Sequence, residues 1–503
     1  MLAPPALFLG LWIVVTVVLF WRLDVRTASL IAVIGGWAIL PNSEYPQSAL
    51  ENGRELFGPV HGMAIPAPPP LNKATAIGLG CLAGILLFHC PTRRPGSPSG
   101  LRPRWFDLPM IAWCAIPLAS SLANGRPPAE GLSQVRHLIL AWGVPYAVGR
   151  LAFAGAPAML QFCRAWVVAG LAYLPFCAVE FVTGPVWYHL AYGGHVYRYD
   201  GAPRRVGHRP LVLLEHGNQL GIWMATAAVA SCWLWATGHR KPLRIGRLTI
   251  PALTVPVALA AACLACQSHA SIALMLLALL PLAVRGRLGH AGKGLVLGGV
   301  GLVGLAVLGA LAWVAINAGG DPRQAARSLF HGLGKSSFTW RLARIQEQFP
   351  TLAAHPLLGR GVADWSGLTP DGTFLDPIAV SLWVLAAGMY GALGLATVAV
   401  ALHLPLAGAA ARLRRLAWDG PQWGGVSAAV AVLAVSVADL AMNSGLLLPV
   451  LIAAGGLTSW AFGPAHVQAE PRSTLNDNQA RLARTLSWLS PESLAQGGRP
   501  PGN

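Results

Sequence analysis

Long apolar runs, separated by shorter polar segments, make up most of this chain. Most of them are long enough to cross a hydrocarbon layer of about 30 Å as a helix that rises about 1.5 Å per residue. The runs cover residues 6–23, 28–41, 74–90, 106–123, 138–154, 160–182, 211–236, 250–267, 269–284, 294–316, 386–408, 425–443 and 446–463. Because the second run is short and two others almost touch at Gln267–His269, we expect about 12–13 spans. The pattern predicts an all-α fold, a polytopic transmembrane helix bundle.

The composition supports this prediction. The chain is 54% hydrophobic and only 11% charged, whereas soluble domains carry about 25% charged residues. The first twenty residues lack a charged start and a small-residue cleavage site, so we expect a retained first span and no removed signal peptide. The eight Cys fall almost entirely in apolar runs, and Cys263-x-x-Cys266 has no second pair at zinc spacing. They therefore predict neither a disulfide framework nor a metal site.

The positive residues predict an orientation. The net charge is +17, and Lys and Arg of membrane proteins concentrate in short cytoplasmic loops. The loops after the third, seventh, ninth and eleventh runs carry clusters of such residues. If every run spans the membrane, these four loops lie on the same side of it. This alternation explains the excess of basic residues, so binding of nucleic acid is not needed to account for it. The remaining loops, predicted to face the other side, are 42–73, 124–137, 183–210 and 317–376.

Two of these outward loops contradict the charge rule, because they contain many Arg residues. The sets are Arg198, Arg204, Arg205 and Arg209 before the seventh run, and Arg323, Arg327, Arg341, Arg344 and Arg360 in the longest loop. Positive charge on the translocated side opposes the predicted topology, so it indicates another role there.

The longest loop is predicted to contain an interfacial helix that begins near Ser336 and ends around Pro350. Apolar residues at helical spacing form one stripe, and a polar stripe lies beside it: Leu342, Ile345, Phe349 and Leu352, then Arg341, Arg344 and Gln348. Such a helix lies on a membrane surface or on the bundle and presents its guanidinium groups. The segment HPLLGRG, residues 355–361, then predicts a turn whose two Gly allow close backbone approach to a ligand.

The arrangement resembles the O-antigen ligase and O-antigen polymerase superfamily of bacterial envelope glycosyltransferases. Its members have about a dozen spans, a long late periplasmic loop, an Arg-rich helix and a Pro-Leu-Leu-Gly-x-Gly turn. EHGNQLGIWMA at 215–225 is similar to the family's Asn-containing start of a span. CQSHASIALML at 266–276 is similar to its Ser-Arg-Gly motif, with His269 in the Arg position. DGTFLDPIAVSLWVLAAGMYGALG at 371–394 is similar to its His-Asn-x-x-Leu segment, with Asp371 in place of the ligases' catalytic His. The resemblance covers about residues 160–460.

The resemblance implies a division of the chain and a location. Residues 1–159 are expected to form N-terminal spans, and residues 160–463 the family-like transmembrane core. Within this core, residues 317–376 are expected to form a periplasmic catalytic loop. Residues 464–503, rich in Pro, Gly, Ser and Gln, are expected to be a mostly disordered cytoplasmic tail. The expected location is a bacterial inner membrane, in which the chain is a multi-pass protein.

The implied reaction transfers a glycan from an undecaprenyl-diphosphate carrier to a sugar hydroxyl, with inversion and without a metal or other cofactor. Arg side chains would stabilise the leaving diphosphate through charge-assisted hydrogen bonds. The acceptor hydroxyl needs a base within hydrogen-bond reach. The candidate catalytic residues are Asp371, Arg341 and His355. The candidates for binding the diphosphate or the sugar are Arg209, His216, His269, Arg344, Arg360 and Asp439.

Four of the candidate residues also have a structural interpretation that the sequence leaves open. Arg341 can extend to lipid headgroups from an interfacial helix. Glu215 and Arg209 can form a structural pair. His269 can be a hydrogen-bonded residue between two spans. Asp371, in Pro-Asp-Gly, can be an ordinary turn residue.

The predicted function is polymerisation of lipid-linked oligosaccharide repeat units into exopolysaccharide or O-antigen, and the missing His at position 371 favours this over ligation. The alternative within the same superfamily is a ligase that moves finished glycan onto lipid A core or protein. From other classes come a transporter or flippase for lipid-linked glycan, and a non-catalytic scaffold. The absence of recognisable repeats or paired broken helices argues against a transporter. The expected partners are the lipid-linked oligosaccharide, a glycan acceptor, the lipid bilayer and other polysaccharide assembly or export proteins.

Overall fold

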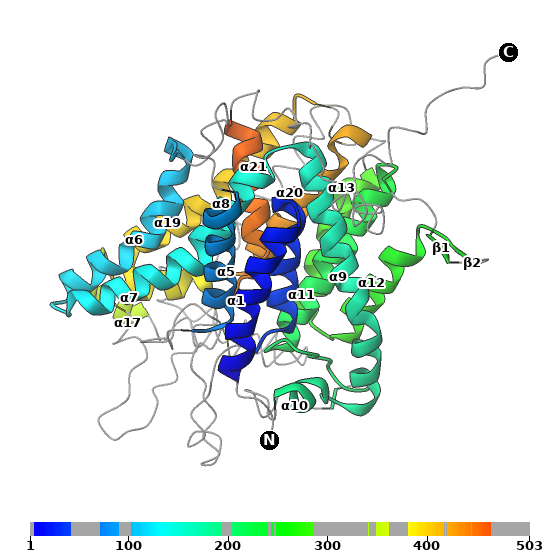
Figure 1. Cartoon of the computed structure of the whole chain (residues 1–503), viewed down its shortest axis with the longest axis horizontal. Coiled ribbons are helices and arrows are strands. Elements are labelled where there is room, and N and C mark those ends of the chain that lie inside the picture. Colours follow the sequence, from blue (N-terminus) through cyan, green and yellow to red (C-terminus); the bar gives the residue numbers. More distant parts are fainter. Residues whose placement is uncertain are drawn as a thin grey trace, which may run out of the picture.

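The protein is a bundle of helices (Figure 1). The structure is a computed structural model that describes residues 5–41, 71–89, 102–192, 203–204, 206–239, 243–245, 248–284, 341, 349–361, 381–416, 418, 420–443 and 445–463. The predicted span 294–316 and the predicted tail 464–503 lie outside these residues.

The first 155 residues contribute several helices, two of which continue through π-helical segments. They are α1 (Pro5–Arg22), α2 (Val25–Leu30), η1 (Ile31–Gly35), α3 (Gly36–Ile39), α5 (Lys73–Phe88), η3 (Trp105–Asp107), α6 (Leu108–Ala123), α7 (Pro128–Leu138), η4 (Ile139–Gly143) and α8 (Val144–Ala152).

The rest of the described chain supplies the longer helices and one small hairpin. The elements are α9 (Ala156–Thr183), α10 (Trp187–Tyr192), α11 (Gly217–Ala236), β1 (Leu243–Ile245), β2 (Leu248–Ile250), α12 (Thr254–Ala265), α13 (His269–Val284), α17 (Phe349–Ala354), α19 (Leu382–Leu413), η5 (Pro421–Trp423), α20 (Gly424–Asp439) and α21 (Val450–Phe462).

The described helices support a membrane protein. Five of them are long and apolar enough to cross a membrane by length and composition: Trp105–Ala123, Ala156–Thr183, Gly217–Ala236, Leu382–Leu413 and Pro421–Asp439. Six shorter apolar helices accompany them: Ala6–Arg22, Val25–Ile39, Lys73–Phe88, Thr254–Ala265, His269–Leu282 and Val450–Phe462. Each predicted run within the described residues contains helix. The number of spans stays a prediction.

Several predicted boundaries are wrong. The predicted loop 124–137 is largely α7, which packs against α6 and continues through η4 into α8. The predicted loop 183–210 contains α10, and α11 begins at Gly217 and not at residue 211. Polarity misled the prediction, because a polar helix packed on a neighbour resembles a loop in sequence. The all-α fold class is confirmed, and the short antiparallel pair of β1 and β2, in which Leu243 is opposite Ile250, is a small addition to it.

The predicted interfacial helix lies mostly outside the described residues. Arg341 is helical, and α17 covers Phe349–Ala354. Pro350 lies in the first turn of α17, where a helix needs no N–H from that residue. Where the predicted helix ends lies outside the described residues.

The packing of α11 and α20 defines two ends of the bundle. A Cβ on Gly424, at the start of α20, would lie 2.2 Å from Oγ1 of Thr237, which follows α11. The two helices pack together, so they run antiparallel and Asp439 lies at the same end as Gly217. We call this end the Gly217 end; it is the lower end in Figure 1.

The opposite end is named after Arg150. Nε of Arg150 donates to Oγ of Ser459, near the end of α21, at 3.1 Å, and Trp460 meets Trp423, which precedes α20, with ring centroids 5.7 Å apart. Asp107 accepts hydrogen bonds from Arg150 and from the hydroxyl of Tyr146. The Arg150 end therefore has its own buried ionic cluster.

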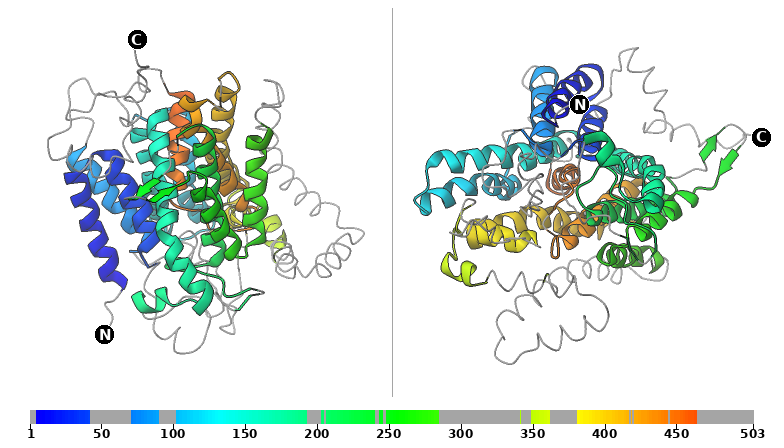
Figure 2. Two further views of the ribbon diagram at one scale, coloured as in Figure 1. Left: turned by 90° about the vertical axis from the view of Figure 1, so that its right-hand side faces the viewer. Right: turned by 90° about the horizontal axis from the view of Figure 1, so that it is seen from below.

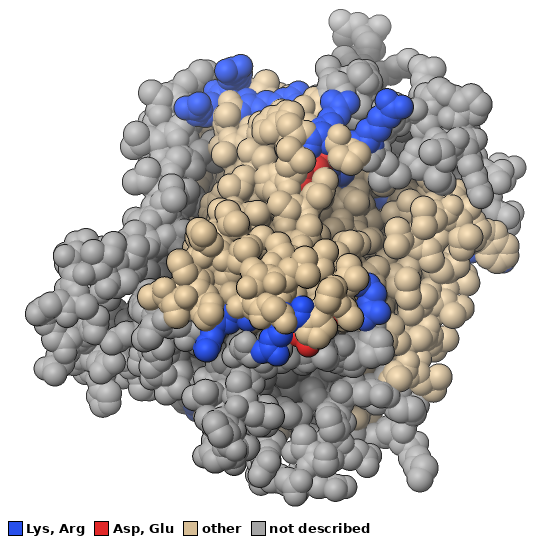
Figure 3. All heavy atoms as spheres, turned by 90° about the vertical axis from the view of Figure 1, so that its left-hand side faces the viewer, with Lys and Arg blue, Asp and Glu red and all other residues tan. Residues whose placement is uncertain are grey.

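Charged side chains are concentrated toward the same two ends of the bundle. On the face shown in Figure 3, Lys and Arg gather near the top and near the bottom, and a wide, mostly uncharged surface separates them. This distribution is what a bilayer imposes on a spanning protein, because charge inside the hydrocarbon is costly.

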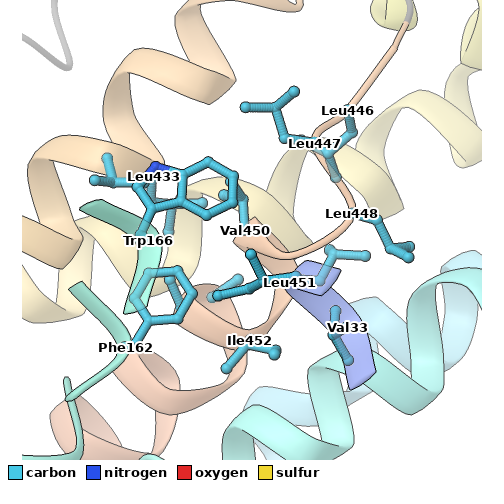
Figure 4. Close-up of a cluster of buried hydrophobic side chains, with 14 of the residues drawn as sticks. Val33, Phe162, Trp166, Leu433, Leu446, Leu447, Leu448, Val450, Leu451 and Ile452 are labelled. Atoms are coloured by element: carbon cyan, nitrogen blue, oxygen red, sulfur yellow. The ribbon is translucent and has the colours of Figure 1, made fainter. Parts of the chain in front are cut away.

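The core is built around α21. Every residue of α21 from Val450 to Trp460 is buried, and the helix lies in the middle of the bundle when seen from below (Figure 2). Figure 4 shows Leu451 and Ile452 of α21 among side chains of α9, α20 and η1. Gly149 and Gly455 allow α8 and α21 to approach closely, since a Cβ on either would lie about 2 Å from a carbonyl oxygen of the partner helix.

Candidate functional site

Arg341 lies at the Gly217 end in a chain of three polar side chains. Its Nη1 donates to the carbonyl of Met442 and to Oδ1 of Asn443, the latter at 2.8 Å. Nδ2 of Asn443 donates in turn to Oδ1 of Asp439 at 2.8 Å. Burial lowers the pKa of the Arg341 guanidinium and the Asp439 carboxylate opposes this. A guanidinium remains cationic under such conditions, so Asp439 and Asn443 hold a cation in a fixed orientation.

The first turn of α19 lies against the same segment. The amide of Leu382 donates to the carbonyls of Leu440 at 3.1 Å and Asn443 at 3.2 Å. Oγ of Ser381 also donates to the carbonyl of Leu440, at 3.2 Å. The N-terminus of a helix carries partial positive charge, so this terminus and Arg341 together favour an anion at this end of the bundle.

Helix α19 is broken at Gly391, and the turn 355–361 supplies hydrogen-bond partners for the backbone groups at the break. Gly391 has φ 66° and ψ −163°, a conformation that is essentially restricted to Gly. The amides of Arg360 and Gly361 donate to the carbonyls of Gly388 and Met389, both at 2.9 Å. In return, the amides of Ala392 and Leu393 donate to the carbonyls of Pro356 and Leu357 at 2.8 and 3.2 Å. Four hydrogen bonds therefore replace those that the break removes.

The turn therefore has a different use from the predicted one. Gly359 has φ 66°, and a Cβ there would lie 2.4 Å from the backbone of Met389 and Tyr390. The close approach that its missing side chain allows is to α19, so the prediction of close approach to a ligand is wrong for Gly359. Asn124 of α6 fixes the turn from another side, through Nδ2 and the carbonyl of Gly359 at 2.9 Å. This leaves Arg360 exposed and His355 half-buried beside the α19 break.

Arg209 is buried and fastens the turn between α12 and α13. Its Nε donates to the carbonyl of Cys266 at 3.0 Å, and its Nη2 to that of Gln267 at 3.1 Å. Its side chain crosses Gly217 so closely that a Cβ there would lie 2.1 Å from Cδ. Arg209 thus joins the start of α11 to the start of α13.

The two predicted His residues stand at helix N-termini of the same end. Nδ1 of His216 accepts a hydrogen bond from the amide of Asn218 at 2.9 Å and so caps α11. His269 is the first residue of α13 and is exposed. Near His216, Glu215 pairs with Lys73, with Oε1 3.8 Å from Nζ. Glu215 thereby contacts the start of α5, a partner that the sequence did not suggest.

Glu180, which the sequence analysis did not single out, organises the segment that carries Arg209. It is fully buried near the end of α9. Its Oε1 accepts hydrogen bonds from the amides of Val186 and Trp187 at 2.9 and 3.1 Å, and its Oε2 from those of Leu211 and Val212 at 2.7 and 2.6 Å. A Glu in an apolar run was the available clue, since a buried carboxyl must find donors.

The Arg341 and Arg209 clusters lie at the same end of the bundle. By the rise of a helix, Asp439 lies alongside α11 about 8 Å from the level of Gly217. Arg344 and Asp371 lie outside the described residues. Among the described residues, no group of three His, Cys, Asp or Glu side chains could hold a metal ion.

Comparison of the chain with protein-family models found no match, and comparison with curated proteins found none. The resemblance to the O-antigen ligase and polymerase superfamily therefore rests on the motifs alone and stays a prediction.

Proposed function

We propose that the chain is a membrane glycosyltransferase that polymerises undecaprenyl-diphosphate-linked oligosaccharide repeat units into exopolysaccharide or O-antigen in a bacterial inner membrane. The observation that carries the proposal is the Arg341–Asn443–Asp439 chain beside the N-terminus of α19. A partly buried, oriented guanidinium at one end of an apolar bundle suits the anionic headgroup of a lipid whose tail stays in the bilayer.

In the proposed reaction, a hydroxyl oxygen of the acceptor sugar attacks the anomeric carbon of the donor. The bond from that carbon to the diphosphate oxygen breaks, and the configuration at the anomeric carbon inverts. Arg341, Arg344 and Arg209 stabilise the negative charge of the leaving undecaprenyl diphosphate. The hydroxyl proton passes to Asp371, with His355 as the other proton acceptor in this part of the chain. No step requires a metal ion or another cofactor.

Arg360, His216 and His269 complete the proposed site as contacts to the sugar or diphosphate. The exposed Arg360 and the exposed His269 both belong to turns that the fold fastens firmly, at the α19 break and between α12 and α13. Firm attachment suits binding residues, because it limits the entropy lost when the ligand is bound.

A carrier for the same anionic lipid is the second candidate function, and the break in α19 favours it. Discontinuous helices are typical of transporters, which bind substrate at the freed helix ends. The hydrophobic pattern of the sequence did not predict this break. In this structure the turn 355–361 satisfies four of the freed groups, which suits a fixed catalytic site better than a moving gate.

Transfer by purified protein in detergent, where no gradient exists, tests the proposal. With lipid-linked repeat units as donor and acceptor, we expect chains of increasing length. Arg341→Ala should lower the rate by about 100-fold, the typical effect of removing one donor to a developing oxyanion. Arg415→Ala, which changes an exposed Arg after α19, is the control and should leave the rate unchanged.

Three outcomes would contradict the proposal. An unaltered rate in Arg341→Ala would remove the residue on which it depends. Transfer to lipid A core or protein, without chain growth, would identify a ligase. Movement of the lipid from one leaflet of a proteoliposome membrane to the other, without glycosyl transfer, would identify a carrier.

A further inference from the structure

Lys73 is a buried cation that the proposed reaction does not yet use. It is the first residue of α5 and is only 5% exposed. Its Nζ has no hydrogen-bond partner in the described structure. The nearest anionic atom is Oε1 of Glu215 at 3.8 Å, beyond hydrogen-bond range. An ammonium group has three N–H donors, and burying them without acceptors is unfavourable.

The position of Lys73 makes this arrangement still less favourable. The N-terminus of α5 already carries partial positive charge, which repels a cation. Asn72 caps that terminus through the amide of Thr75 at 3.0 Å and contacts the ring of His137 at 3.4 Å, so its side chain is engaged elsewhere. The fold thus holds the ammonium group of Lys73 at a helix N-terminus without a hydrogen-bond acceptor among the described residues.

Lys73 and Arg209 approach the same short segment from two sides. Nζ of Lys73 lies near Glu215, and the side chain of Arg209 crosses Gly217, two residues later. Two residues of backbone span at most about 7 Å. Lys73 and Arg209 thus bring two cations to the starts of α5 and α11, beside Glu215.

We propose that Lys73 is a phosphate-binding residue for a diphosphate headgroup. In the empty protein Glu215 is its counter-ion, and when the ligand binds, the ammonium group donates to a phosphate oxyanion instead. The inference rests on the proposed function, since the diphosphate is that of the lipid-linked donor. It adds α5, from the N-terminal part of the chain, to a site that the sequence placed entirely between residues 209 and 439.

The pair predicts opposite effects for its two members. Lys73→Met removes a charged donor and should weaken diphosphate binding at least about 10-fold. Glu215→Gln removes the competing anion with little change of shape, so diphosphate should bind about 5-fold more tightly. A merely structural ion pair would lower stability in both variants and leave the affinity of the folded protein unaltered. Arg150→Met, which breaks the buried Arg150–Asp107 pair at the other end, is the matched control and should leave affinity unchanged.

The experiment measures binding to the full chain in detergent by isothermal titration calorimetry. The two probes are inorganic pyrophosphate and a polyprenyl diphosphate, and the ellipticity of each variant at 222 nm reports folding. The expected result is weaker binding of both probes by Lys73→Met and tighter binding by Glu215→Gln. If Lys73→Met does not fold, the affinity of Glu215→Gln for the two probes decides whether the inference holds. An effect on pyrophosphate alone would overturn the assignment to a lipid headgroup.

Failure of this inference can be distinguished from failure of the proposed function. If Arg341→Ala weakens binding while Lys73→Met and Glu215→Gln do not alter it, the inference about Lys73 is wrong and the proposed function stands. If both Lys73 and Glu215 variants behave as expected but the wild-type protein transfers no sugar, the diphosphate site stands and the glycosyltransferase proposal is wrong.

Discussion

At the residue scale, buried polar side chains are placed by the backbone groups they satisfy. Glu180 accepts four amide hydrogen bonds, two from Val186 and Trp187 and two from Leu211 and Val212. Arg209 satisfies two carbonyls at the α12–α13 turn. Glu180 lies in an apolar run and Arg209 follows a basic segment, and neither local pattern identifies the hydrogen-bond partners. What the sequence does indicate is that each must have partners, because an isolated charge does not persist in an apolar environment.

Glu180→Gln tests this role. The amide NH₂ group must face one of the two pairs of backbone amides, so two hydrogen bonds are lost and two donors oppose each other. We expect the free energy of unfolding to fall by about 3 kcal/mol, measured by unfolding in mixed detergent micelles. Glu130→Gln, at an exposed position in the first turn of α7, should change it by less than about 0.5 kcal/mol. Equal stability of the two variants would contradict the role of Glu180.

At the element scale, α19 is the least predictable part of the site. Its sequence is a continuous apolar run with several Gly, which predicts one straight span. The structure divides it at Gly391, because the turn 355–361 supplies donors and acceptors at that depth. The half-helix before the break, about 13 Å long, is thereby fixed at both ends, at Asn443 and at Arg360. Its position relative to Arg341 depends on this attachment.

Gly391→Ala should disrupt that attachment. Ala must adopt a conformation that is essentially reserved for Gly, and its Cβ would lie 2.2 Å from the backbone carbon of Leu357. We expect a loss of about 3 kcal/mol in unfolding free energy, with increased proteolysis within residues 349–361. Gly238→Ala separates the two causes, because Gly238 also has positive φ, 79°, but nothing within 4 Å of a Cβ. The unfolding free energy of that variant should fall by only about 1 kcal/mol. A similar loss in both variants would show that the contact between the turn 355–361 and α19 is unimportant for stability.

At the scale of the whole molecule, the two charged ends give the bundle an orientation in a bilayer. The Gly217 end carries Arg341, Arg209 and Lys73, and the Arg150 end carries the Arg residues that follow α19. On the face shown in Figure 3, Lys and Arg likewise lie in two groups separated by a mostly uncharged surface. If the positive-inside rule applies to the short loops, the Arg150 end is cytoplasmic and the candidate site faces outward.

Cysteine labelling tests this orientation. In a variant without the eight native Cys, Arg360→Cys and Arg415→Cys place single thiols at exposed positions of the two ends. A membrane-impermeant maleimide should label Arg360→Cys in intact spheroplasts and Arg415→Cys only in inside-out vesicles. Labelling of both variants from one side would contradict the spanning bundle. Labelling of Arg360→Cys from inside alone would contradict the outward site, since the lipid-linked donor would then lie on the wrong side.

The sequence by itself determined the apolar helices and the concentration of charge between them, because burial in lipid acts on each residue through its own hydrophobicity. It therefore predicted helix in every described run from Ala6 to Gly463, and it singled out Arg341, Arg209 and Asp439 as misplaced charges. Only the tertiary structure decided which of them meet. The Asn443 bridge, the Lys73–Glu215 pair and the break at Gly391 each join residues far apart in the chain. Hydrogen bonds of this kind depend on distances of a few tenths of an ångström, which hydrophobic periodicity does not encode.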